Sequence, residues 1–311
     1  MFVLPRPLRI GTRGSPMALI QTGLVRDRLV AAHPDLGATG AIEIVTIRTT
    51  GDRVQNRRLA EIGGKGLFSK EIEEALIARA IDLAVHSLKD METWLPDGLE
   101  IACVPSREDP RDALLSTKAG SLAGLPKGAR VGTASLRRQA QLLRLRPDLS
   151  VVPIRGNVNT RIDKLASGEF DAIVVALCGL ERLGKADLAT EILMPEIMLP
   201  AVGQGALAIE CRAEDNALRQ LLDPLHDPDT AACVGAERAM LAALDGSCRT
   251  PIAGLAECDG KRLTLEGLLL KPDGSAEIRA RANGDISDAA ALGGALGSEL
   301  RSQAGPGFGL A

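Results

Sequence analysis

Apolar residues along the chain alternate between strand-like runs and helix-like spacing. The first part predicts a strand at 8–10, a helix at 17–31 and a strand at 42–47. Apolar positions at helical spacing between 68 and 76 then precede a short apolar strand at 83–85. Repeated alternation of helices and strands is typical of an α/β fold built on a parallel sheet.

The same pattern returns in the middle of the chain. Strands are expected at 130–132, 151–154 and 172–176, each followed by a polar loop and a helix. A glycine turn and a further apolar run at 199–211 indicate a return crossing to the first part of the chain. Two lobes joined by two crossings would enclose a cleft, and ligands of open α/β sheets gather at the carboxyl ends of strands.

The last quarter has a different order of elements. A helix at 231–243 is followed by two strands around the turn Pro272-Asp273-Gly274 and by a helix at 287–302. These elements predict a small α+β domain with a frayed tail beyond residue 304. The expected fold class is therefore α/β, with two lobes that enclose a cleft and a small α+β C-terminal domain. The expected boundaries are 1–104 with 205–224 for the first lobe, 108–200 for the second, and 228–311 for the C-terminal domain.

Composition narrows the functional classes. The 311 residues are 45% apolar and carry a net charge of −3, with only 2% aromatic residues. Stacking platforms and a broad basic face for nucleic acid are therefore not expected. No apolar stretch has the length of a membrane span or an export signal, which predicts a cytoplasmic protein. A metal site is not expected, because the six cysteines include no C-x-x-C pair and the chain has only three histidines. Most of the thiols should instead be buried.

Candidate chemistry begins with Lys89 and Asp90, an amine and an acid directly after the strand at 83–85. This is the place where an α/β fold carries a catalytic carboxylate, although two solvated surface neighbours would give the same pattern. The glycine-rich segment 63–66, which includes Lys65, has the composition of a lid over a site, or of a plain surface loop.

Basic residues recur where strands end. Ser15 is a suitable N-cap beside Arg13, so this helix start can bind an anion or be an ordinary cap. Arg137 and Arg138 lie in the first turn of a predicted helix, where their charges oppose the helix dipole unless an anion is present. The other candidates are Arg155 and Arg161, which flank Gly156 in a predicted loop, and Arg182.

Cys248 differs from the other cysteines because it lies in a loop of small residues beside Arg249. A neighbouring guanidinium favours the thiolate and so a nucleophile, although an inert loop cysteine has the same surroundings.

Several motifs in this order resemble the porphobilinogen deaminase (hydroxymethylbilane synthase) family. They are Arg13-Gly14-Ser15-Pro16, Gly63 to Phe68, His86 to Asp90, Arg107 to Asp112, Val131 to Arg138, Arg155 to Arg161, Leu199 to Gly205 and Gly246 to Pro251. The resemblance implies condensation of four porphobilinogen molecules with loss of ammonia, and hydrolytic release of 1-hydroxymethylbilane. It also implies that the two α/β lobes are periplasmic-binding-protein-like. A further implication is a monomer with a dipyrromethane cofactor bound covalently through a thioether to Cys248.

Residue roles follow from the same resemblance. Asp90 would be the catalytic acid, which assists departure of the amine, stabilises cationic pyrrole species and helps to remove the ring proton. The cofactor's side chains would bind Ser87, Lys89, Thr133, Ser135, Arg137, Arg138 and Gly156. Substrate carboxylates would bind Arg13, Ser15, Arg155, Arg161 and Arg182, and Lys65 and Phe68 would belong to a mobile loop over the cleft.

Two positions depart from the family pattern. Ser247 stands where glycine commonly precedes the cysteine, and Met91-Glu92 replaces the more usual Val-Pro after the aspartate. A competing interpretation is a binding protein for a small polyanion, since two lobes and a basic cleft would also serve as a receptor.

Overall fold

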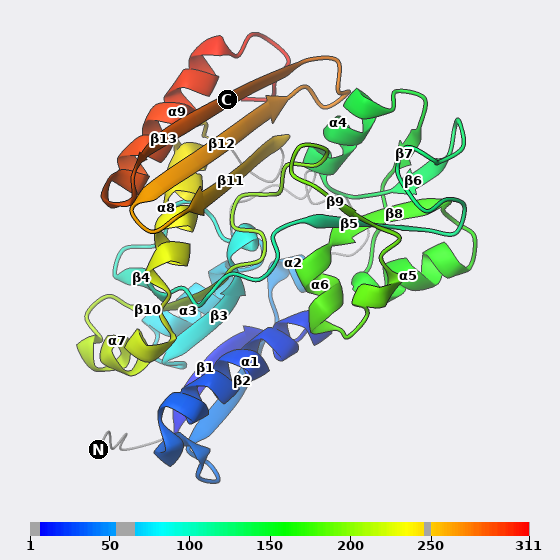
Figure 1. The fold of residues 1–311 in the computed structure, drawn as a ribbon. Coiled ribbons are helices and arrows are strands. Elements are labelled where there is room, and N and C mark those ends of the chain that lie inside the picture. The colour runs from blue at the N-terminus through cyan, green and yellow to red at the C-terminus, as the bar shows by residue number, and fades with distance from the viewer. Residues whose placement is uncertain (1–6, 54–65, 246–249, 311) are drawn as a thin grey trace. The chain divides into compact units, whose positions relative to one another are not determined.

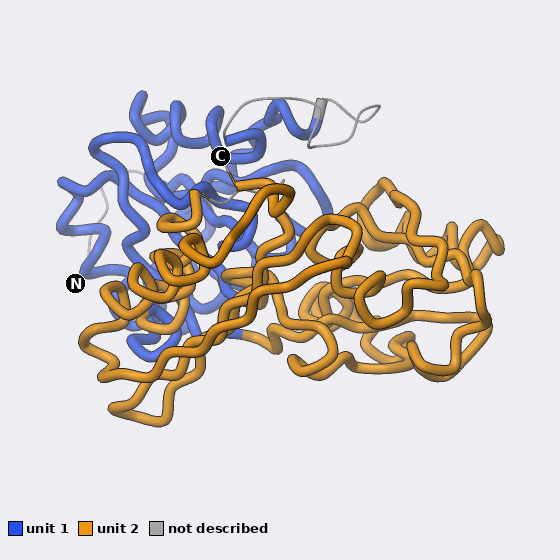
Figure 2. Tube along the Cα trace, turned by 90° about the horizontal axis from the view of Figure 1, so that it is seen from above, with its two compact units in different colours: residues 1–107, 206–231 blue, residues 108–205, 232–311 orange. Residues whose placement is uncertain are grey.

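The computed structural model describes residues 7–53, 66–245 and 250–310. The chain divides into two compact units (Figure 2). Unit 1 runs to Arg107 and includes Ala206–Ala231, and unit 2 consists of Glu108–Gly205 and the chain from Ala232 onwards. The chain therefore crosses from unit 1 to unit 2 after Arg107 and returns after Gly205, in agreement with the two expected crossings. It crosses to unit 2 again after Ala231.

Unit 1 is built on a five-stranded sheet with the order β2-β1-β3-β10-β4 (Figure 1). Strand β1 is parallel to both β2 and β3, whereas β10 is antiparallel to β3 and β4. The strands are β1 (Leu8–Arg13), β2 (Ile42–Ile47), β3 (Leu83–Ser87), β4 (Leu99–Cys103) and β10 (Leu207–Arg212). The helices are α1 (Pro16–Ala32), α2 (Thr50–Arg53), α3 (Lys70–Ile77) and α7 (Asn216–Leu222).

Unit 2 contains a second five-stranded sheet of the same plan, with the order β7-β6-β8-β5-β9. Here β6 is parallel to β7 and β8, and β5 is the antiparallel strand. The strands are β5 (Asp112–Ser116), β6 (Arg130–Gly132), β7 (Ser150–Val152), β8 (Ala172–Ala176) and β9 (Glu191–Leu193). The helices are α4 (Leu136–Leu145), α5 (Val158–Ala166) and α6 (Leu177–Arg182).

Both of these sheets are mixed, whereas the alternation of strands and helices indicates only a parallel arrangement. The antiparallel strands β5 and β10 are the first strands after the crossings that follow Arg107 and Gly205. A local apolar pattern identifies such a segment as a strand but carries no information on its direction, which depends on where the crossing enters the sheet. Strand β5 was not predicted from the sequence, in which Pro105 and Pro110 precede it.

The remaining elements of unit 2 form a three-stranded antiparallel sheet with two helices. Close packing of the helices requires glycine, since a Cβ on Gly293 would lie 2.1 Å from the carbonyl oxygen of Ala236. The tail is not frayed, because Phe308 is buried in this core and Lys271 Nζ lies 5.7 Å from its ring centroid. The elements are α8 (Pro228–Ala243), β11 (Ile252–Cys258), β12 (Arg262–Leu270), β13 (Glu277–Asp285) and α9 (Ala289–Gln303).

The predicted fold class of two α/β lobes and a small α+β domain is confirmed, while the predicted domain boundaries stay a prediction. Four cysteines are buried as expected: Cys103, Cys178, Cys211 and Cys233. Within the three described ranges, no helix is both long and apolar enough to cross a membrane.

Candidate functional site

Asp90 lies at the carboxyl end of β3 in a short 3-10 turn, Leu88–Asp90. Leu88 and Met91 are buried on either side of it, and the Leu88 N–H donates to the carbonyl of Ala206 at 3.1 Å. Lys89 and Asp90 are exposed between these two anchors. The turn therefore presents an acid and an amine to solvent on a fixed backbone.

Ser87 and His86 point in opposite directions from the end of β3, as successive strand residues do. The Ser87 hydroxyl accepts a hydrogen bond from Gln21 Nε2 of α1 at 2.7 Å. His86 Nε2 lies 2.9 Å from a carboxylate oxygen of Glu210, and both side chains are buried. Burial raises the pKa of Glu73 nearby, and the charge of Glu210 adds to the rise.

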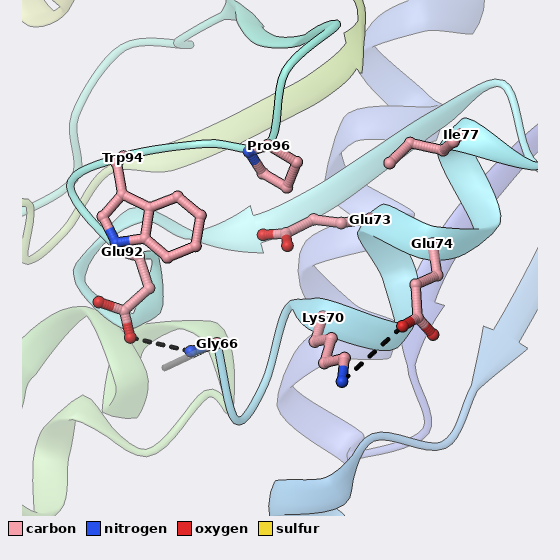
Figure 3. Close-up of a pocket in the computed structure, with 8 residues that line it drawn as sticks. All are labelled: Gly66, Lys70, Glu73, Glu74, Ile77, Glu92, Trp94 and Pro96. Atoms are coloured by element: carbon pink, nitrogen blue, oxygen red, sulfur yellow. Dashed lines mark hydrogen bonds and ion pairs between the residues drawn. The ribbon is translucent and has the colours of Figure 1, made fainter. Parts of the chain in front are cut away.

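A pocket of about 250 Å³ lies between α3 and the segment that follows Asp90 (Figure 3). Its lining is acidic, with the carboxylate of Glu73 pointing into it and Glu92 accepting a hydrogen bond from the Gly66 N–H at 2.9 Å. Trp94 is half exposed at the same pocket. Such a pocket repels carboxylates, so we do not assign it to an acidic ligand.

Arg13 ends β1 and is held by two groups of unit 1. Its Nε lies 3.2 and 3.3 Å from the carboxylate oxygens of Asp52, and its guanidinium carbon lies 4.1 Å from the ring centroid of Phe68. Ser15 caps α1, as predicted, by accepting a hydrogen bond from the Ala18 N–H at 3.2 Å. Phe68 thus covers Arg13 from the turn before α3.

In unit 2 the start of α4 is built from hydroxyl groups. Ser135 accepts a hydrogen bond from the Arg138 N–H, and the Ser135 N–H donates to Thr133 Oγ1 at 3.2 Å. Thr133 is buried and its N–H donates to the carbonyl of Val152. Ser135 is thus the N-cap of α4, a cap that was not identified from the sequence, and two hydroxyl groups lie at the carboxyl end of β6.

Arg137 and Arg138 are buried and share one carboxylate, Asp112, at 2.7 Å each. Burial acts to raise the pKa of Asp112, but the two guanidinium groups outweigh it and hold that pKa well below its usual range. The anion expected at this helix start is therefore the carboxylate of Asp112, which belongs to the chain itself. Binding of a cofactor by these two arginines remains a prediction.

The loop before α5 needs glycine, because Gly156 has φ of +108° and a Cβ there would lie 2.6 Å from Thr160. Asn157 caps α5 by accepting a hydrogen bond from the Thr160 N–H at 2.9 Å. Arg161 lies in this helix, not in the loop as expected, since the cap begins the helix earlier. Its Nε donates to the Gly156 carbonyl at 2.9 Å.

Positive charge accumulates around Arg161. Burial lowers its pKa to about 10, and the like charges of Arg138 and Arg155 contribute to the lowering. Within the described ranges Arg161 makes no ion pair with a carboxylate. A partly buried cation with cationic neighbours favours an anionic ligand.

Arg182 has an internal partner. Its Nε lies 2.7 Å from Glu108, its side chain is 5% exposed, and Nη2 is 3.4 Å from the carbonyl of Gly205. Arg182 is thus less available to a ligand than Arg161. Lys65 and Cys248 lie outside the described residues.

Asp52 and Asp112 were not identified from the sequence. The available signal for Asp112 was an acid at the start of an apolar run, which implies a buried carboxylate and hence a cationic partner. Asp52 carried no such signal, because it lies in a polar segment.

The group implied by the family resemblance fits the residues of unit 2. A dipyrromethane carries acetate and propionate groups, and Arg155 and Arg161 supply planar cations, with hydroxyl groups from Thr133 and Ser135. The pKa of Arg161 is lowered first by burial and then by the charges of Arg138 and Arg155, which such carboxylates would neutralise. Among the described residues, no group of three histidine, cysteine or acidic side chains could hold a metal ion.

Comparisons with known proteins agree with this chemistry. Residues 8–220 match the family model "Porphobilinogen deaminase, dipyromethane cofactor binding domain", and residues 231–302 match "Porphobilinogen deaminase, C-terminal domain". A porphobilinogen deaminase of Nitrobacter winogradskyi is 54% identical over 96% of this chain and 94% of its own length. The porphobilinogen deaminase of Paracoccus denitrificans is 54% identical over 96% of this chain and 95% of its own length. The one from Sorangium cellulosum is 51% identical over 96% of this chain and 99% of its own length.

Solved structures similar to the chain include a periplasmic substrate-binding protein of Coxiella burnetii, with a TM-score of 0.43 and 16% identity. That match covers 74% of this chain and 96% of the other. A nutrient-binding protein of Burkholderia cenocepacia has a TM-score of 0.42 and 14% identity, and the match covers 72% of this chain and 93% of the other. The two family models and the three relatives together show that this chain belongs to the porphobilinogen deaminase family.

Proposed function

We propose that the chain performs its family's reaction as a cytoplasmic monomer, with Asp90 as the catalytic acid. The reaction condenses four porphobilinogen molecules, with loss of ammonia, and releases 1-hydroxymethylbilane by hydrolysis. The observation that carries the role of Asp90 is its exposure between the buried anchors Leu88 and Met91. A receptor for a small polyanion is not favoured, because the family matches cover nearly the whole chain.

Asp90 would act on porphobilinogen through its charge and its basicity. The bond between the methylene carbon and nitrogen breaks, ammonia leaves with the electron pair, and positive charge spreads over the pyrrole. A carboxylate beside that ring stabilises the cation. After the new carbon–carbon bond forms, the same carboxylate can accept the proton that the ring loses.

The basic residues of unit 2 would bind carboxylates. Arg155 and Arg161 can each grip an acetate or propionate with two parallel hydrogen bonds. Thr133 and Ser135 would hold the cofactor's side chains, and Ser87 and Lys89 would do so from unit 1. When bound through Cys248, the dipyrromethane supplies the pyrrole carbon to which the first substrate unit is joined.

The test of the proposed cofactor is the intact mass of the purified protein beside its Cys248→Ala variant. We expect the unaltered protein to carry the added mass of two linked pyrrole units, and the variant to lack it. A cysteine that is buried in the structure, for example in Cys233→Ala, serves as the control, and this variant should keep the added mass. If both well-folded proteins had only the masses of their own sequences, before and after incubation with porphobilinogen, attachment at Cys248 would be contradicted.

Replacing Arg161 with leucine is expected to stop elongation early. The change removes a partly buried cation that has no carboxylate partner among the described residues, so a growing polyanionic chain loses a binding group. Mass spectra of the enzyme during turnover should show short pyrrole chains accumulating, with a lower yield of tetrapyrrole. Arg144→Leu, on an exposed face of α4, is the control. An unchanged yield from Arg161→Leu would place this residue outside the binding site.

A further inference from the structure

Arg13 is already bound on one edge by a carboxylate of the chain. Besides the two contacts of Nε, its Nη2 lies 2.5 Å from Oδ1 of Asp52. The ring of Phe68 covers the guanidinium group. A carboxylate on the Nε and Nη2 edge of a stacked arginine has the geometry with which proteins bind acidic ligands.

Asp52 is held in place by its neighbours. Its carboxylate accepts hydrogen bonds from the Thr49 hydroxyl at 2.7 Å and from the Thr49 N–H at 3.3 Å. Burial acts to raise the pKa of Asp52, but the hydrogen bonds from Arg13 and Thr49 outweigh it, so that pKa lies below its usual value. Asp52 is therefore ionised at neutral pH.

The helix α2 that carries Asp52 is fastened as well. The Thr50 N–H donates to Glu71 of α3 at 2.9 Å, and the Gly51 N–H donates to the carbonyl of Leu67 at 2.8 Å. The ring of Phe68 packs so closely on Gly51 that a Cβ would lie 2.2 Å from it. Several hydrogen bonds and the packing of Phe68 on Gly51 therefore fix the position of Asp52 beside Arg13.

We propose that Asp52 is an internal competitor for the carboxylate site of Arg13, so that an acidic group of the substrate must exchange with it. The proposal rests on the proposed function and on the role of Arg13 in binding substrate. Exchange of one carboxylate for another keeps the guanidinium paired in both states, which avoids the cost of an unpaired, partly buried charge.

Weak binding is what stepwise elongation needs at such a position. Four acidic units are added one after another, and a site that holds a carboxylate too firmly would delay the next addition. With Asp52 present, the pair with Arg13 is neutral, so a substrate carboxylate gains only the difference between two similar contacts. Asp52 thereby lowers the affinity of Arg13 for a substrate carboxylate and speeds the release of that carboxylate.

The test is Asp52→Asn, which keeps the shape of the side chain and removes its charge. We expect the KM for porphobilinogen to fall about tenfold, as loss of one nearby negative charge close to a protein surface allows. The kcat should fall with it, and enzyme-bound intermediates should accumulate in intact mass spectra. Asp52→Ser is a second variant of different shape, and circular dichroism checks the folding of each.

The matched control is Asp148→Asn. Asp148 accepts hydrogen bonds from Arg146 Nε at 2.8 Å and Nη2 at 2.7 Å, and the two side chains are 25% and 21% exposed, close to the values for Asp52 and Arg13. This variant should leave KM, kcat and the mass spectrum unchanged. In Arg13→Gln the KM should rise, and adding Asp52→Asn to that variant should bring no further gain in affinity.

The outcomes separate the alternatives. A rise in KM for Asp52→Asn at unchanged kcat would overturn the proposal and make Asp52 a residue that orients Arg13. Unchanged KM in both Asp52→Asn and Arg13→Gln would overturn it because Arg13 would bind no substrate, while the proposed function would stand. Failure of the unaltered enzyme to form tetrapyrrole would instead refute the proposed function.

Discussion

Asp90→Ala should lower the rate of tetrapyrrole formation by about 10³-fold or more while the protein stays folded. Removing a group that stabilises transition-state charge costs rate on this scale. The side chain is exposed and the turn is held by the buried residues Leu88 and Met91, so the fold loses little. The measurement is the initial rate at saturating porphobilinogen, with intact mass to verify that the cofactor is still attached.

Asp97→Ala is the matched control for this variant. Asp97 is another exposed aspartate, seven residues further along the same connection. Its removal should leave the rate unchanged. An Asp90→Ala enzyme with a nearly normal rate would show that another group carries the chemistry, whereas loss of the cofactor's mass would reassign Asp90 to cofactor assembly.

Asp112→Ala should destabilise unit 2 by about 3–5 kcal/mol, the usual cost of leaving buried charges without their partner. Asp112 is fully buried, and it pairs with Arg137 and Arg138 while accepting a hydrogen bond from Gln204 at 2.9 Å. Both guanidinium groups would lose their only carboxylate within the described ranges. Urea unfolding followed by circular dichroism gives the change, and hydrogen exchange in β5 and β8 locates it.

The pH dependence has a definite sign. Because the folded-state pKa of Asp112 lies below the unfolded value of about 3.9, its contribution is fully present above that value. The contribution is lost as the pH falls towards the folded-state pKa. The difference in stability between the unaltered protein and Asp112→Asn should therefore be constant from pH 6 to 8 and shrink at pH 3.

Asp148→Ala is the comparison for this experiment, since its pair with Arg146 is only partly buried and solvent screens it more than the Asp112 network. It should change the unfolding curve little. Equal effects of the Asp112 and Asp148 substitutions would mean that full burial of the Asp112 network contributes nothing beyond a partly buried pair.

Much of the local structure could be predicted from the sequence. Apolar spacing placed α4 and the strands β2, β6 and β8 at their observed bounds, and Ser15 was correctly predicted as the cap of α1. These features depend on neighbours within a few positions, where propensity and capping act. The order of several short motifs also identified the family, because the residues of each motif are contiguous.

Contacts between distant segments required the tertiary structure. The antiparallel direction of β5 and β10 follows from where the chain enters each sheet, and no local pattern carries that information. Local patterns also do not show which acidic side chain pairs with which arginine. The sequence identified Arg13, Arg137 and Arg138 as candidates for binding an anionic ligand, without showing whether the chain supplies their partners.

Only the fold decided that Asp52 lies against Arg13 and that Asp112 lies between Arg137 and Arg138. These partners are 39, 25 and 26 residues apart in the chain, so the carboxylate that neutralises each cation cannot be read from its surroundings in the sequence. The sequence thus determined which residues can do the chemistry, and the tertiary structure decided which of their charges remain available for a ligand. The physical reason is that a charge acts through space, and its strength depends on burial and on partners that only folding brings within a few ångströms.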